Sequence, residues 1–160
     1  RADIPDLHLD IVGGGWWRQR LVDHAAALGI SAAVTFHGHV DDDVKHEVVQ
    51  RCWVHIMPSR KEGWGLAVIE AAQHAVPTIG YRGSGGLTDS VVDGVTGLLV
   101  DGPDDLVGAL RRLLADPVLR HELGAKACAR SAEFSWALSA QAMRTVLDEV
   151  AAGRRVSGVV

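Results

Sequence analysis

The sequence is poor in cysteine and aromatic residues and has no long apolar segment. Its two cysteines, Cys52 and Cys128, lie far apart and without a C-x-x-C spacing. Neither a disulfide framework nor a cysteine zinc site is therefore predicted, and we expect two buried free thiols. No apolar run approaches the roughly 20 residues of a membrane helix, and residues 1–5 lack the apolar core of a signal peptide. These absences favour a cytoplasmic protein.

The chain also carries little positive charge. Among 160 residues, 16 Lys and Arg stand against 20 Asp and Glu, which gives a formal net charge of −4. This balance argues against a surface that binds nucleic acid or an anionic membrane. Hydrophobic residues make up 48% and charged residues 22% of the chain. That composition predicts one globular domain with a buried core and excludes a disordered chain.

Short apolar segments alternate along the chain with amphipathic segments of helical length. This alternation predicts an α/β fold, a doubly wound parallel sheet built from βα units. Strands are expected at 7–12, 33–36, 53–57, 77–81 and 97–100, with helices at 18–28, 43–52, 66–74 and 87–92. Three further helices, at 104–115, 117–132 and 135–152, predict a C-terminal helical extension with Asp104 and Ser135 as N-caps. Residues 153–160 are expected to be a frayed tail.

The segment 58–72 carries the strongest chemical signal. A predicted strand ends at Met57, a glycine-broken loop follows, and a helix opens near Gly65. Phosphates bind at this position in α/β proteins, because the helix N-terminus is positive and its N–H groups point outward. Gly63 and Gly65 would let the backbone approach a ligand closely. The segment therefore predicts a site for a phosphate or diphosphate.

Two carboxylates flank this predicted anion site. Glu62 precedes the helix, and Glu70 lies about five residues inside it, roughly 7 to 8 Å along the axis. Because like charges repel, these carboxylates suit hydroxyl groups on either side of a diphosphate. A nucleotide sugar has that layout, with a hexose at one end and a ribose at the other. The alternative is an ordinary helix start with Glu62 near its N-terminus and Glu70 in solvent.

The Glu-x7-Glu spacing of Glu62 and Glu70 resembles the signature of retaining GT-B glycosyltransferases, especially glycosyltransferase family 4, also called group 1. The resemblance extends from about residue 7 to residue 150. Further matching segments are Ile-Val-Gly-Gly-Gly at 11–15, Phe-His-Gly-His-Val at 36–40, Gly-Gly-Leu-Thr-Asp-Ser-Val at 85–91 and Asp-Gly-Val-Thr-Gly-Leu-Leu-Val at 93–100.

The resemblance implies that residues 1–152 form the Rossmann-like donor-binding domain of a bacterial enzyme, the C-terminal half of a GT-B fold. Such an enzyme transfers a hexosyl group from a nucleotide diphosphate sugar to an acceptor, with retention of configuration. The acceptor would enter through an N-terminal domain that this sequence does not contain, and any membrane association would come through that domain. Neither a metal nor another cofactor is implied. The donor's sugar and base stay open.

The resemblance also implies a role for each site residue. Glu62 would be the catalytic carboxylate and bind hydroxyls of the donor sugar, and Glu70 would bind the ribose. The other implied donor contacts are Gly63, Trp64, Gly65 and Leu66 through their backbone, Gly38 and Val40 near the base, and Gly13 and Gly15 in the turn that follows the first strand.

Two features of the family have no counterpart here. Members carry an upstream strand and a basic loop that neutralises the diphosphate, and nothing precedes Arg1. Arg60 and Lys61 could replace the basic loop, or they could be solvated. The upstream strand would occupy the middle of the sheet, so strands 7–12 and 53–57 are expected to lack their shared neighbour. The chain by itself is therefore expected to be inactive.

Alternative functions rest on weaker signals. A noncatalytic sugar-nucleotide-binding or structural module is the main alternative. A nicotinamide-dependent oxidoreductase is disfavoured, because the glycines at 13–15 lack the rest of the dinucleotide fingerprint and an acidic residue about 20 positions later. His37 and His39 lack an obvious third metal ligand. Trp16, Trp17 and Trp64 could stack a base or sugar, with simple packing as the alternative.

Overall fold

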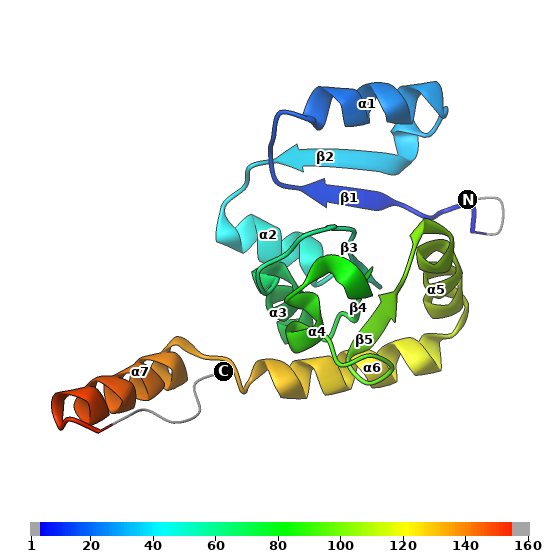
Figure 1. The fold of residues 1–160 in the computed structure, drawn as a ribbon. Coiled ribbons are helices and arrows are strands. Elements are labelled where there is room, and N and C mark those ends of the chain that lie inside the picture. The colour runs from blue at the N-terminus through cyan, green and yellow to red at the C-terminus, as the bar shows by residue number, and fades with distance from the viewer. Residues whose placement is uncertain (1–3, 155–160) are drawn as a thin grey trace. The chain divides into compact units, whose positions relative to one another are not determined.

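The computed structural model describes residues 4–154 and has a mixed α/β architecture (Figure 1). The chain divides after Arg51 into two compact units, which are described separately. In the first unit the order of elements is β1 (Leu9–Val12), α1 (Arg18–Ala27), η1 (Ser31–Ala33), β2 (Val34–Gly38) and α2 (Asp42–Val49). Strands β1 and β2 are parallel, with Leu9 opposite Val34 and Ile11 opposite Phe36.

The second unit is a parallel three-stranded sheet with helices. Its sheet has the order β3-β4-β5, and both strand pairs are parallel. The elements are β3 (His55–Met57), α3 (Leu66–Gln73), β4 (Thr78–Tyr81), η2 (Arg82–Ser84), α4 (Leu87–Ser90), β5 (Gly97–Val100), α5 (Pro103–Ala115), α6 (Pro117–Ser131) and α7 (Trp136–Ala151).

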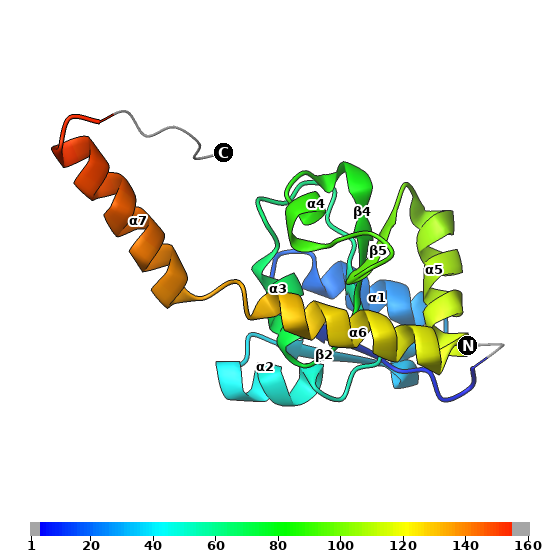
Figure 2. The ribbon, with the colours of Figure 1, turned by 90° about the horizontal axis from the view of Figure 1, so that it is seen from below.

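The core of the second unit lies on both faces of its sheet. Neighbouring residues of β5 serve opposite faces, because side chains alternate along a strand. Leu99 packs with residues of α3 and α4, whereas Leu98 packs with residues of α5 and α6. Figure 2 shows α4 on one side of β4 and β5 and α5 on the other. The first cluster comprises Val68, Leu87, Val91 and Leu99, and the second comprises Ile79, Leu98, Leu113 and Leu123. This two-sided packing holds α3 and α4 against one face of the sheet and α5 and α6 against the other.

Strands β1 and β3 lie at edges of their sheets in the described residues. In the described residues β1 pairs with β2 alone, and β3 pairs with β4 alone. One backbone edge of β1 and one backbone edge of β3 therefore have no strand partner in the described residues.

The structure bears on four further details of the sequence interpretation. Asp104 is not an N-cap, because Pro103 occupies the first turn of α5 and Gly102 is the capping residue. Ser135 caps α7 as expected, accepting a hydrogen bond from the Leu138 N–H. Cys52 and Cys128 form no disulfide with each other, as expected, but both are half-buried and not buried. In the predicted tail, residues 155–160 lie outside the described part of the chain.

Across residues 4–154, no helix combines the length and apolarity that crossing a membrane would require.

Candidate functional site

The loop between β3 and α3 is held by backbone pairing with the segment that follows β4. The Glu62 N–H donates to the Ser84 carbonyl at 2.7 Å, and the Gly86 N–H donates to the Glu62 carbonyl at 3.1 Å. Glu62 and Gly85 thus form a parallel bridge. The segment 82–86, which follows β4, is therefore hydrogen-bonded to the loop that carries the candidate site.

Glycine is required at two points of this pairing. A Cβ on Gly86 would lie 1.8 Å from the Gly63 carbonyl oxygen, so the two loops can approach only without a side chain there. Gly65 adopts a left-handed conformation, with φ of 83°, directly before α3. A Cβ at Gly65 would lie 2.7 Å from Leu87. Both glycines thus set the entry of the chain into α3.

Four consecutive backbone donors remain unused at this entry. Within the described part of the chain, the N–H groups of Gly63, Trp64, Gly65 and Leu66 donate to no other protein group. Gly63 and Leu66 are exposed. A run of free N–H groups leading into a helix is an anion-binding arrangement, since the donors and the helix dipole favour negative charge. The structure thus provides the backbone donors that the sequence predicted.

The two candidate carboxylates lie on either side of these donors along the chain. Glu62 is half-buried, and its backbone is held independently of its side chain by the pairing with Ser84 and Gly86. Glu70 is half-buried in α3 and lies close enough to His55 of β3 to affect its titration. Because it is half-buried, Glu70 is not the purely solvated residue of the alternative interpretation.

His55 is the one described residue with a strongly shifted imidazole. Its Nδ1 lies 3.0 Å from the Thr78 hydroxyl oxygen. Burial lowers the pKa of His55 to about 4, and the nearby Glu70 carboxylate offsets only part of that effect. The ring is therefore neutral at pH 7.

We expect this histidine to make the protein less stable in mild acid. The pKa of about 4 in the folded state lies below the unfolded value near 6.5, so protonation favours unfolding. The stabilisation is complete above pH 6.5, is lost as the pH falls towards 4, and amounts to about 2 to 3 kcal/mol. Denaturant unfolding at pH 7, 6, 5 and 4 should show a steeper loss for the wild type than for His55→Gln. Parallel curves for the two proteins would contradict this assignment.

The segment 93–100 owes its shape to an ion pair that the sequence analysis did not identify. Arg82 donates to the Asp93 carboxylate at 2.7 Å and to the Leu99 carbonyl at 2.8 Å. Asp93 also accepts from the Leu99 N–H at 2.9 Å. That backbone donor, followed by Arg82, holds the pKa of Asp93 below its usual value. The segment 93–100, which matches the family, therefore has a structural role here, because Asp93 and Leu99 bind Arg82 and so connect η2 to β5.

The other candidate residues near the loop have different roles. Arg60 and Lys61 are exposed, as expected for solvated cations, and lie just before Glu62. The Trp64 ring packs edge-on against Phe134, with ring centroids 4.8 Å apart. The Trp64 indole ring is therefore packed against the protein, while the backbone N–H of Trp64 has no protein acceptor.

In the first unit, the two glycine turns meet at the ends of parallel strands. The Gly13 N–H donates to the Gly38 carbonyl at 2.7 Å, and the two glycines have φ of 111° and 71°. Gly15 is exposed, and Val40 is half-buried two residues after β2. The structure thus brings the turn after β1 and the turn after β2 together, as the candidate roles of these four residues require.

The first unit also contains histidine and tryptophan side chains considered in the sequence analysis. His37 lies 2.7 Å from an Asp10 carboxylate oxygen across the two strands, and no group of three metal-ligating side chains occurs among residues 4–154. Trp16 is 84% exposed and Trp17 is 44% exposed, so core packing is not their role. The Arg20 guanidinium stacks on the Trp17 ring at 4.1 Å.

Comparison with known sequences identifies relatives for most of the chain. A sequence profile of the family described as "Glycosyl transferases group 1" matches residues 1–130. A D-inositol 3-phosphate glycosyltransferase from Acidothermus cellulolyticus is 38% identical over 141 residues, which cover 87% of this chain and 31% of that protein. The protein of the same name from Corynebacterium diphtheriae is 34% identical over 152 residues, which cover 91% of this chain and 35% of that protein. The chain spans about a third of the length of these relatives.

Solved structures share the fold. Sucrose-phosphate synthase from Thermosynechococcus elongatus superposes with a TM-score of 0.86 at 31% identity, over 95% of this chain and 40% of that one. HepE from Anabaena, in complex with UDP and glucose, superposes with a TM-score of 0.83 over 91% of this chain and 41% of its own. At 20% identity the HepE likeness shows the fold alone. The predicted α/β fold with parallel strands is confirmed.

Proposed function

This chain belongs to the group 1 glycosyltransferases, and on that basis we propose that it is the donor-binding domain of an enzyme that transfers a hexosyl group from a nucleotide diphosphate sugar. Transfer would retain the configuration at the anomeric carbon. The acceptor would be bound by another part of the whole protein. The site at the start of α3 would bind the donor.

One observation carries the proposal: the four free N–H groups from Gly63 to Leu66 precede and open a helix. During transfer, negative charge builds on the leaving diphosphate. Fixed N–H dipoles stabilise such charge without reorganising at the moment of reaction. The exposed Arg60 and Lys61 would add positive charge on the same side of the loop. The diphosphate is therefore assigned to this run of donors, and no metal ion is needed in this proposal.

The carboxylates would bind the two ends of the donor. Glu62, at the start of the donor run, would accept hydrogen bonds from the sugar hydroxyls and act as the catalytic carboxylate. Glu70 would accept hydrogen bonds from the ribose hydroxyls. The half-buried position of each side chain supports these roles, because a carboxylate that is partly removed from water binds hydroxyls more strongly than a solvated one.

A separate part of the proposal concerns the glycine turns of the first unit. Gly38 and Val40 are assigned to the base, and Gly13 and Gly15 to a turn that lines the donor. The bond between Gly13 and Gly38 supports a common role for these turns. Solved relatives of the same fold contain UDP, including HepE with UDP and glucose, so a uridine donor is the first candidate.

Calorimetric titration of UDP and GDP into the full-length protein tests this proposal. We expect one nucleotide to bind, and Glu70→Ala to weaken that binding about tenfold, since a charged partner of the ribose is lost. Glu122→Ala is the matched control, because Glu122 is an exposed glutamate of α6 in the same unit. Binding should be unaffected by a chelator. If neither UDP nor GDP binds, the proposal is contradicted and a structural module is favoured.

A further inference from the structure

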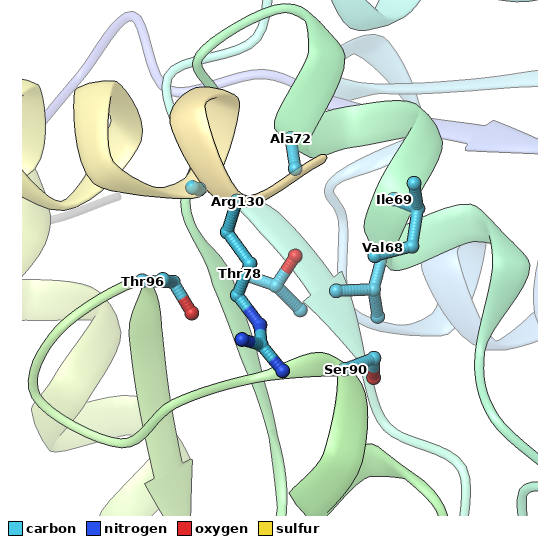
Figure 3. Close-up of a pocket in the computed structure, with 8 residues that line it drawn as sticks. Val68, Ile69, Ala72, Thr78, Ser90, Thr96 and Arg130 are labelled. Carbon is cyan, nitrogen blue, oxygen red and sulfur yellow. The ribbon is translucent and has the colours of Figure 1, made fainter. Parts of the chain in front are cut away.

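Arg130, near the end of α6, occupies a position where an arginine is costly. Its Nε is the one buried side-chain nitrogen or oxygen in residues 4–154 without a hydrogen-bond partner. Figure 3 shows the side chain between Thr78, Thr96 and Ser90, which line a cavity of about 10 Å³. That space holds at most one water. A buried nitrogen without a partner costs free energy, while the two terminal nitrogens of this half-buried side chain do have partners.

Arg130 contacts the support of the candidate donor site through α4. Its Nη2 donates to the Asp89 carbonyl at 2.9 Å. Asp89 lies three residues after Gly86, whose N–H donates to the Glu62 carbonyl. The Arg130 Nη1 lies 3.5 Å from the carboxylate of Glu133, three residues further along the chain. The first connection therefore leads from Arg130 through α4 to Glu62.

A second connection reaches the same loop from the other side. The guanidinium carbon of Arg130 lies 5.3 Å from the centre of the Phe134 ring. The Phe134 ring in turn contacts Trp64 edge-on, with centroids 4.8 Å apart. Trp64 provides one of the four free N–H groups and stands between Gly63 and Gly65. Packing of its indole therefore restricts the backbone that carries the donors.

We propose that Arg130 and Phe134 form a junction clamp, which positions the N–H groups of 63–66 for the donor diphosphate. The clamp rests on the proposed function for the identity of the ligand. Its two members come from the junction between α6 and α7 and reach the loop through separate contacts, on Asp89 and on Trp64. They are positioning residues and do not touch the donor. A donor site of four backbone groups needs such support, because small displacements weaken binding strongly.

The test combines UDP affinity with hydrogen exchange of the peptide 60–68 in the full-length protein. Arg130→Met and Phe134→Leu should each speed exchange in this peptide and weaken UDP binding about tenfold. The double variant should be little worse than the more severe single variant, because the Arg130 guanidinium also contacts the Phe134 ring directly and each residue holds the other in place. Leu123→Val, in the core on the same helix, controls for destabilisation alone. It should lower Tm and leave UDP affinity and loop exchange unchanged.

Two results would overturn the clamp. In the first, Arg130→Met and Phe134→Leu both leave hydrogen exchange in peptide 60–68 as it is in the wild type. In the second, Leu123→Val changes exchange and UDP affinity as much as the clamp variants do. Faster exchange in both clamp variants, in a protein that itself binds neither UDP nor GDP, would support the positioning of the loop by the clamp while refuting the proposed donor function. The two hypotheses can thus fail separately.

Discussion

Glu62→Ala is expected to reduce kcat/KM for glycosyl transfer by about 10²- to 10³-fold, because the sugar loses the carboxylate that orients it. The backbone of residue 62 keeps its bonds to Ser84 and Gly86 whatever its side chain. The loop should therefore stay folded, and UDP affinity should change by less than about threefold, because UDP lacks the sugar that Glu62 binds.

The measurement is steady-state kinetics with the full-length protein and its acceptor, beside UDP titration of the same variant. Glu122→Ala again serves as the control for removing a glutamate from the second unit. If kcat/KM of Glu62→Ala is within twofold of the wild-type value, Glu62 is not the catalytic carboxylate. A loss of UDP affinity equal to the loss of activity would instead place Glu62 on the diphosphate side.

Gly86→Ala should have the largest effect on stability. The added Cβ would lie 1.8 Å from the Gly63 carbonyl oxygen and 2.9 Å from the Trp64 Cα. Because both are backbone atoms, the two loops must separate, and the Glu62 pairing with Gly85 should be lost. We expect the free energy of unfolding to fall by about 3 kcal/mol or more. UDP binding should be lost in the same variant.

Gly83→Ala is the matched control for this substitution. Gly83 lies three residues earlier in η2, and a Cβ there would meet nothing within 4 Å. Denaturant unfolding of both variants should show a large loss for Gly86→Ala and a change within about 0.5 kcal/mol for Gly83→Ala. Equal stabilities would show that the two loops can separate freely and that their pairing does not support the site.

Local features of the site could be predicted from the sequence. Strand β5 occupies 97–100 as expected, and α3 begins at Leu66, directly after Gly65. Glycines in a loop that leads into an apolar helix have a local signature, since backbone conformation depends on the residue itself and its neighbours. The unused N–H groups of 63–66 follow from that local geometry.

The supports of the site could not be predicted, because they join segments distant in the chain. Nothing in the periodicity of α6 indicates that Arg130 reaches Asp89, 41 residues earlier. The pairing of Arg82 with Asp93 likewise joins two exposed charges that look solvated in the sequence. The shifted pKa of His55 depends on what packs around β3. Such contacts are set by tertiary packing, for which one sequence has no periodic signal.

A crystal structure of the full-length protein with UDP tests the central claim most directly. The account predicts diphosphate oxygens within hydrogen-bond distance of the N–H groups of Gly63, Trp64, Gly65 and Leu66. It also predicts the ribose hydroxyls at the Glu70 carboxylate. A diphosphate bound elsewhere, with these four N–H groups facing only solvent, would contradict the assignment of the donor site to the start of α3.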